Sequence, residues 1–322
     1  MYEIEIKREK GRSPRASREK EKLRSEGVYG KEPRRKKRKA SGPVSGVKGV
    51  IAFISVIVFS TALSTVAMHA TNGVPLSETL LGSAVQTGEQ GPCPQGMVFV
   101  DSGSGGFCID EFENAPSSAC PYATPSGSHD TEENIETAEC GVVSHAEREP
   151  WRHVARHQAE RLCSSAGKRL PTPEEWYLAA LGTPSHTNEN EAPVCNLDGS
   201  EPLTGSELPD CRSSVGAISM TGNVWEWVSG DVVSGEWEGR TLPESGYVSS
   251  VDSAGMPIET AREPQRSYGN AYARTKKDES VYGILRGGWW GSDTEGGIYA
   301  ANAAVEPSFS GRAVGFRCAR SL

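Results

Sequence analysis

Short apolar runs bounded by turn residues, which are typical of β-strands, occur at several places from about residue 93 onward. Residues 93–100 and 107–110 are two such runs on either side of a Gly/Ser-rich connection, so they predict a β-hairpin. The stretch MTGNVWEW, residues 220–227, predicts a turn at Gly-Asn that leads into a strand. A carboxylate between two indoles must be paired, hydrogen-bonded or bound to a metal, unless the strand is half-buried and Glu226 points to solvent.

One stretch shows helical periodicity without a clear start. Residues 150–166 predict an amphipathic helix, whose apolar face consists of Trp151, Val154, Ala155, Leu162 and Cys163. His153 and His157 are spaced i,i+4 with Glu160 nearby, a spacing that can hold a metal. No third group of ligands accompanies them, and histidines on a solvated helix face are far more common.

A second helix has well-defined ends. Thr172 is the expected N-cap, Pro173 takes the first helical position, Glu175 completes a capping box and Gly182 ends the helix. Arg169, just before the cap, is a candidate for a buried ion pair.

Three segments lack periodicity. Residues 116–136 are rich in Pro, Ser, Gly and acidic residues and predict a loop insertion. Residues 183–214 are also irregular, and residues 229–280 predict a long connection whose loops gather over a scaffold.

The N-terminal part differs from the rest in charge. Residues 1–48 hold 17 Lys/Arg and 7 Asp/Glu, a net charge of +10, whereas the chain as a whole carries −8, so the remainder carries −18. This segment has few apolar residues and predicts a disordered, basic cytoplasmic tail. A basic tail can bind nucleic acid, but beside a membrane helix its simpler role is to fix topology and contact anionic lipid.

Residues 49–69 are uncharged up to Met68 and apolar, about the length that crosses a bilayer. Together with the preceding RRKKRK cluster they predict a transmembrane signal-anchor helix, with the N-terminus in the cytoplasm and the C-terminal domain outside the plasma membrane. A signal peptide cleaved after Ala67 or Ala70 is the alternative, although the basic region is far longer than a usual n-region. Residues 70–92 read as a linker, and residues 93–322 as the folded domain.

All eight cysteines follow the apolar segment, and none forms a CxxC pair. An even number in an exported domain predicts disulfides. The hairpin would bring Cys93 near Cys108, Cys120 and Cys140 would pin the insertion, and Cys195 and Cys211 bracket an irregular segment.

Three motifs follow one another in order: GKRLPTPEEW at residues 167–176, GNVWEW at 222–227, and LRGGW at 285–289 with VGFR at 314–317. In this order and spacing, the chain from about Gly91 to Leu322 resembles the sulfatase-modifying factor family, whose founding members are formylglycine-generating enzymes. The resemblance implies an α+β fold, loop-rich and irregular, related to C-type-lectin-like domains. It also implies a disulfide between Cys163 and Cys318.

Calcium is a further implication of the resemblance, and hard cations prefer such oxygen-rich loops. The first site would use Asn196, the Leu197 carbonyl, Asp210 and the Arg212 carbonyl. The second would fall at Ser219, Gly222, Val224 and Glu226, where Ser219 replaces the usual Asn or Asp. Alternatively, the Asn and Asp residues of these loops are solvated turn residues that bind no cation.

Copper is not expected. Formylglycine-generating enzymes bind copper(I) through two cysteines after the RGG motif, and these positions are Ser292 and Gly297 here. Iron-dependent branches of the family hold iron with histidines of a separate helical domain, for which this chain has no room outside the tail.

Other branches of the family are binding proteins whose variable residues lie between RGG and GFR. Residues 289–313 here are rich in Trp, Tyr, Asn, Ser and Asp, which suits recognition. We therefore expect a membrane-anchored extracytoplasmic binding or structural module, with an unknown glycan or protein ligand. The alternative is an enzyme with a changed active site. A surviving pocket would have a floor of aromatic residues with two polar contacts, namely Trp225, Trp227, Trp289, Trp290, Asn223 and Arg286.

Overall fold

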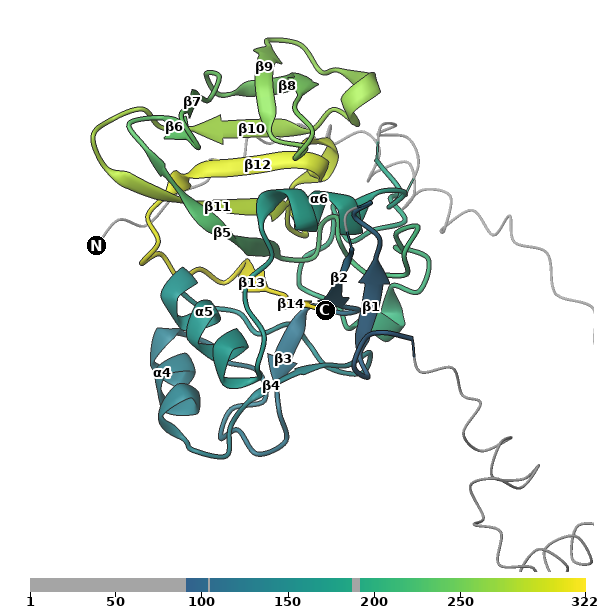
Figure 1. Cartoon of the computed structure of the whole chain (residues 1–322), viewed down its shortest axis with the longest axis vertical. Helices are drawn as coiled ribbons and strands as arrows, with labels where there is room; N and C mark the ends of the chain where they lie inside the picture. Colours follow the sequence, from purple (N-terminus) through teal and green to yellow (C-terminus); the bar gives the residue numbers. More distant parts are fainter. Residues whose placement is uncertain (1–90, 104, 187–191) are drawn as a thin grey trace, which may run out of the picture. The chain divides into compact units, whose positions relative to one another are not determined.

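A large mixed sheet dominates the computed structural model (Figure 1), with the spatial order β7-β6-β5-β11-β12-β10-β8-β9. Its strands are β5 (Trp225–Val233), β6 (Glu236–Trp237), β7 (Arg240–Thr241), β8 (Gly246–Val251), β9 (Pro257–Ala261), β10 (Tyr272–Thr275), β11 (Val281–Gly287) and β12 (Gly297–Val305). A further strand, β13 (Val314–Phe316), pairs in parallel with β5 on the side away from the β11 pairing. The motif strand β5 therefore has strands on both sides.

The structure describes residues 91–103, 105–186 and 192–322, which belong to one unit. The predicted tail, the predicted transmembrane helix and nearly all of the predicted linker lie outside the described residues. Within those ranges, no helix is long and apolar enough to cross a membrane.

Two small sheets complete the β-structure. The predicted hairpin is confirmed as β1 (Met97–Val100) and β2 (Phe107–Asp110), which pair antiparallel. The C-terminal strand β14 (Ala319–Ser321) pairs with β2, so both ends of the domain meet in one sheet. The second small sheet consists of β3 (Asn114–Pro116) and β4 (Val142–Ser144).

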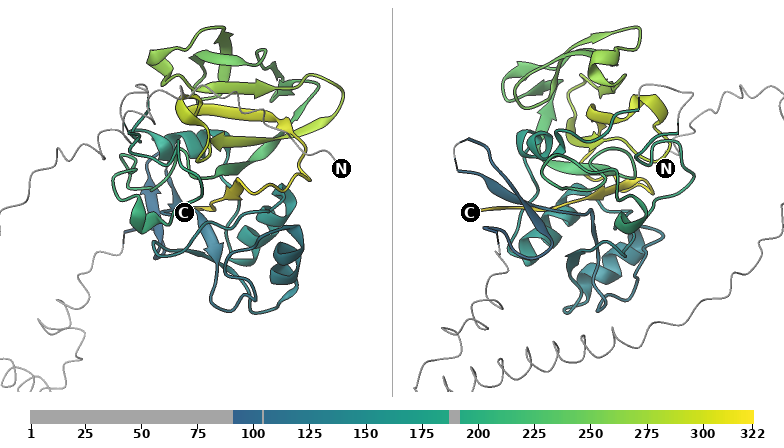
Figure 2. Two further views of the ribbon diagram at one scale, coloured as in Figure 1. Left: turned by 180° about the vertical axis from the view of Figure 1, so that it is seen from behind. Right: turned by 90° about the vertical axis from the view of Figure 1, so that its right-hand side faces the viewer.

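The predicted capped helix is confirmed as α6 (Pro173–Ala180). Thr172 accepts a hydrogen bond from the Glu175 amide at 3.1 Å, and Glu175 accepts one from the Thr172 amide at 2.9 Å. Gly182 follows with φ +83°. The helix packs against β5 and β12, as Figures 1 and 2 show, and brings the fully buried Trp176 to the sheet.

The other predicted helix begins six residues later than expected, as α5 (Arg156–Ser165). Trp151 and Val154 are buried as predicted, but they precede the helix in an irregular segment. Long-range hydrogen bonds keep these residues out of the helix, because the Trp151 amide donates to the Asn114 carbonyl and the His153 amide donates to the Gly311 carbonyl.

Two segments predicted as loops contain regular structure. Residues 116–136 include α4 (Ser128–Glu136), which has few apolar residues and is held by polar contacts. The buried Asn134 bonds both backbone groups of Tyr122 at 2.9 and 2.8 Å. Residues 229–280 contribute β6 to β10, short strands without strict alternation, so the prediction of a loop connection there was wrong.

All four disulfides form as predicted: Cys93–Cys108, Cys120–Cys140, Cys163–Cys318 and Cys195–Cys211. The result is a sheet-rich mixed fold with few helices in the described residues, which agrees with the expected α+β class. The relation to C-type-lectin-like domains stays a prediction.

Candidate functional site

Glu226 lies at the centre of the domain and is 1% exposed. Its neighbours across the sheet are Arg286 on β11 and Gly315 on β13, and it is flanked in sequence by the buried Trp225 and Trp227. The carboxylate is therefore in the interior, where it needs a partner.

Arg317, just after β13, is that partner and is fully buried. Its Nε and Nη2 donate to Glu226 at distances between 2.6 and 3.0 Å. Its remaining hydrogen bonds go to the carbonyls of Asp110, Glu111 and Ile218. Since every guanidinium nitrogen is engaged, this buried pair is also hydrogen-bonded, the condition under which burial of an ion pair is tolerated.

Trp176 completes the bonding of Glu226. Its indole Nε1 donates to Glu226 Oε2 at 2.7 Å, so α6 is tied to β5 through the carboxylate. On the neighbouring residue, Trp227 Nε1 donates to the Val154 carbonyl at 2.9 Å, which ties the segment before α5 to the same strand.

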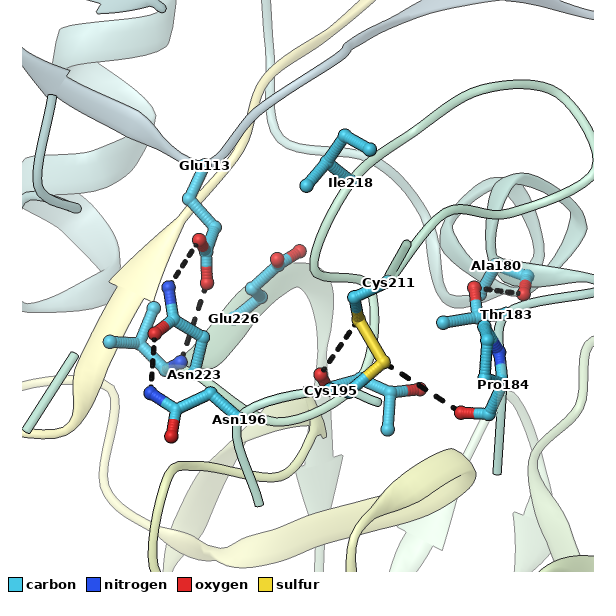
Figure 3. The surroundings of a disulfide bond; sticks show 12 residues. Glu113, Ala180, Thr183, Pro184, Cys195, Asn196, Cys211, Ile218, Asn223 and Glu226 are labelled. Carbon is cyan, nitrogen blue, oxygen red and sulfur yellow. Dashed lines mark hydrogen bonds between the residues drawn. A yellow bond between two sulfur atoms is a disulfide. The ribbon is translucent and has the colours of Figure 1, made fainter. Parts of the chain in front are cut away.

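Glu113 is a second buried carboxylate and lies next to Glu226 in Figure 3. It accepts hydrogen bonds from Asn223 Nδ2 at 2.7 Å and from the Val224 amide at 3.3 Å. Burial, then the charge of Glu226, raises the pKa of Glu113 to about 8, although Arg317, Asn223 and Val224 act in the opposite direction. Asn223 in turn accepts from Asn196 Nδ2 at 3.0 Å, so the Glu113 carboxyl begins a chain of polar contacts (Figure 3).

Asp110 is a third buried carboxylate, and it has its own cation. Lys168 Nζ lies 2.5 Å from Asp110 Oδ1, while Asn114 and the Cys318 amide donate to Oδ2. Arg317 thus forms an ion pair with Glu226, and Lys168 forms one with Asp110. Within the described residues, Glu113 is thus the carboxyl of this cluster that has no cation of its own.

At the predicted first calcium site, Asn196 is buried and donates through Nδ2 to Glu201 and Asn223. Its Oδ1 lies against Gly199, in the space that a Cβ atom would need, at 2.2 Å, so this oxygen requires a glycine beside it. The Leu197 carbonyl accepts from the Asp293 amide at 2.8 Å, and Asp210 is exposed. Arg212 bonds the Gly216 carbonyl through its side chain.

At the predicted second site, Ser219 has a left-handed backbone, φ 59°, and its buried Oγ finds no hydrogen-bond partner among the described residues. Gly222 is also left-handed at φ +77°, and the Val224 amide is taken by Glu113. The unpartnered hydroxyl fits a cation ligand. The Glu226 carboxylate does not, because Arg317 and Trp176 already hold both of its oxygens.

The two positions of the copper cysteines carry no thiol. Ser292 Oγ accepts from the Trp289 amide at 2.9 Å. Gly297 has φ +141°, a conformation that L side chains rarely adopt. All eight cysteines are in the four disulfides, so the domain has no free thiolate with which to bind copper(I).

Five of the six side chains predicted to form a pocket floor are buried. Asn223, Trp227 and Arg286 have no exposed surface, and Trp225 and Trp290 are 7% and 3% exposed. Arg286 instead holds the loop before β9, because its Nη2 donates to Gly255 at 2.9 Å and its guanidinium stacks on Trp176. Of the set, Trp289 is half-buried and open to a ligand.

The histidine pair does not share a helix face. His153 has φ 57° and precedes α5, whereas His157 lies within it. Among the described residues, no group of three or more His, Cys, Asp or Glu is placed to hold a metal ion. Arg169 does form the predicted ion pair, with Glu175 at 2.6 Å, but its side chain is 41% exposed, so the pair is not buried.

Neither Glu113 nor the role of Arg317 was predicted from the sequence. Arg317 belongs to the VGFR motif, and a buried Glu226 requires a cation. The sequence could therefore have predicted the Glu226–Arg317 ion pair. Glu113 lies in a run of charged residues after β2, which by itself indicates a surface turn.

Several known proteins are similar to this chain in sequence. Residues 106–322 match the model of the sulfatase-modifying factor enzyme 1-like domain. The inactive C-alpha-formylglycine-generating enzyme 2 of Bos taurus is 27% identical over 33% of this chain and 40% of its own. The hercynine oxygenase of Mycobacterium tuberculosis is 28% identical over 50% of this chain and 32% of its own.

The chain thus spans less than half the length of these curated relatives. Among solved structures, a variant of the major tropism determinant (P3c) aligns over 71% of this chain and 53% of its own, at 19% identity and a TM-score of 0.39. The family model covers about two thirds of the sequence, including all three motifs and the Glu226–Arg317 pair. This chain belongs to the family of sulfatase-modifying factor enzyme 1-like domains.

Proposed function

We propose that this protein is a binding or structural module on a formylglycine-generating-enzyme scaffold, without copper-dependent oxidase activity. The observation that carries the proposal is the lack of any free thiol, since every cysteine is in a disulfide and Ser292 and Gly297 take the copper positions. Copper(I) needs soft donors. The bovine relative, named as inactive, shows that such members occur in the family.

Incubation of the protein with a cysteine-containing sulfatase peptide, copper and reductant tests the proposal. Mass spectrometry should detect no aldehyde above a control with copper alone. A formylglycine-generating enzyme assayed in parallel shows that the peptide and conditions are competent. Turnover above the copper control would refute the proposal.

The alternative is an oxidoreductase with a changed active site, and the match to hercynine oxygenase favours it. It predicts oxygen consumption with a substrate other than the sulfatase peptide. No oxygen uptake across exported peptides and small thiols would count against it.

We further propose that the module is anchored in a membrane by residues 49–69, with the C-terminal domain on the extracytoplasmic side. Support comes from the apolar sequence, the RRKKRK cluster before it and the confinement of the cysteines, all now disulfide-bonded, to the part beyond it. Protease added to sealed right-side-out vesicles should digest the domain and leave a short protected fragment that contains the tail. Protection of the whole chain would overturn the topology.

Calcium binding at Asn196 and Asp210 is part of the same proposal. The glycine at position 199, which leaves space for Asn196 Oδ1, and the unpartnered Ser219 Oγ support it. Because the Glu226 carboxylate is committed to Arg317, the second position would rest on neutral oxygens and bind calcium more weakly than the first.

A further inference from the structure

Three segments meet at a basic and aromatic surface, which we call the Arg312 patch and which consists of Arg152, His153, Trp289, Phe309 and Arg312. The His153 amide donates to the Gly311 carbonyl at 3.1 Å, which joins the segment before α5 to the segment before β13. The Arg312 guanidinium lies 5.8 Å from the ring centres of both Trp289 and Trp290. These contacts join segments that are far apart in sequence, and the Phe309 ring lies against Gly311, next to Arg312 in the chain.

Arg312 is exposed, and it makes no hydrogen bond or ion pair with the part of the chain that the structure describes. A guanidinium beside an indole keeps its N–H edge free for a ligand. Arg152 is also poorly satisfied, since its buried Nε has no partner among the described residues and its contact with Glu149 is long, at 3.5 Å.

The pKa of His153 depends on the charged groups around its imidazole. Burial lowers the pKa of His153 first and the charge of Arg152 lowers it further; the charge of Asp130 raises it, and the charge of Arg312 lowers it by a smaller amount. Asp130 is itself bonded by the Ser126 amide and hydroxyl at 2.8 and 2.7 Å. His153 therefore lies within reach of both guanidinium groups, with Asp130 as the facing carboxylate.

This positive surface is set in an acidic protein, since residues 49–322 carry −18 in a chain of −8 overall. Charge complementarity therefore indicates an anionic ligand. Trp289 and Phe309 are each half-buried and offer a small apolar face, less than the core of a stable protein interface requires. A small ring with an acidic group matches both features.

We propose that the Arg312 patch binds an acidic sugar, whose apolar face rests against Trp289 and Phe309 while its carboxylate or sulfate pairs with Arg312 and Arg152. The proposal rests on the proposed function as a binding module and specifies its ligand class. Carboxylated and sulfated sugars share the required chemistry, so both enter the test.

The test uses the full chain with a uronic-acid disaccharide, a sulfated disaccharide and a neutral disaccharide of the same size. The basic tail also attracts polyanions, so the readout must be local. Hydroxyl-radical footprinting should show protection of Trp289 and Phe309 by at least one of the acidic disaccharides but not by the neutral one. The acidic disaccharide that gives the stronger protection shows whether the patch prefers a carboxylate or a sulfate.

Arg312→Gln should weaken this protection about tenfold, the loss expected for one charge-assisted hydrogen bond. Arg320→Gln is the matched control, because Arg320 is exposed on β14 and its replacement removes the same charge outside the patch. Near-ultraviolet circular dichroism confirms that both variants keep the fold.

Failure to protect Trp289, equal protection by the neutral sugar, or unchanged protection in Arg312→Gln would each overturn the proposal. Protection by an acidic peptide in place of either sugar would overturn it in favour of a protein partner. Aldehyde formation in the copper assay is a separate result, so refutation of the binding-module proposal is distinguishable from failure of this ligand assignment.

Discussion

Replacement of Glu113 by glutamine should remove the part of the pH dependence of stability that Glu113 contributes between pH 5 and pH 8. In the folded protein the pKa of Glu113 is raised to about 8 by burial and by Glu226, whereas an unfolded glutamate titrates near 4.5. The unfolded chain therefore releases this proton at lower pH than the folded chain does. The stability contributed by the protonated carboxyl is fully present below pH 4.5 and is lost as the pH rises towards 8.

The magnitude follows from the two pKa values. At pH 8 the cost of keeping this carboxyl protonated is on the order of 4 kcal/mol, and at pH 5 it is about 1 kcal/mol. The wild-type protein should lose at most about 3 kcal/mol of unfolding free energy across this interval. The glutamine oxygen can still accept from Asn223, but its NH2 group cannot accept from the Val224 amide, so the 3.3 Å hydrogen bond is lost, at a cost of about 1 kcal/mol.

Urea unfolding at several pH values, with chelator present, measures this effect. Other groups also titrate in this window, such as His153, whose lowered pKa gives the opposite trend below pH 6.5. The difference between wild type and Glu113→Gln cancels them. Glu139→Gln, at an exposed position, is the control and should keep the wild-type pH dependence. Parallel pH profiles for wild type and Glu113→Gln would refute the reasoning.

Two further predictions concern charge at the centre of the domain. Arg317→Met should cost about 3–5 kcal/mol in urea unfolding, because it leaves Glu226 buried without its cation, whereas Arg320→Met should change little; equal effects would contradict the central role of Arg317. Calcium at a hundred times its Kd should add about 2.7 kcal/mol of stability if it binds the folded state alone, and Asp210→Asn should reduce that gain. A melting temperature that responds to neither calcium nor chelator would count against both calcium sites.

Local chemistry predicted the features whose cause is local. The capping box of Thr172 and Glu175 is complete within four residues, so α6 has the expected bounds. Sequence proximity likewise placed Cys93 near Cys108 across a hairpin and Cys195 near Cys211 across a loop. The Cys163–Cys318 bridge, which spans 155 residues, followed from the family resemblance and has no local signature.

Features that depend on distant partners were missed. α4 has a weakly apolar sequence and is stabilised by Asn134 and Thr131, which bond Tyr122 and Trp151 respectively. The strands between residues 236 and 275 lack strict alternation, and their pairing is decided by neighbours such as β12. Burial of the expected pocket floor also depends on distant partners, since Trp227 and Arg286 lie fully buried on the central strands β5 and β11.

The central cluster explains why the motifs can persist on a domain without copper cysteines. Glu226 joins α6 through Trp176, and Arg317 joins β13 to the carbonyls of Asp110 and Glu111 at the end of the hairpin. Loss of Glu226 or Arg317 would leave a buried charge unpaired, at a cost of several kcal/mol, a large fraction of the stability of a typical domain. These contacts hold the fold together whether or not any chemistry occurs at position 292. The motifs therefore specify the scaffold, and by themselves they do not indicate copper chemistry.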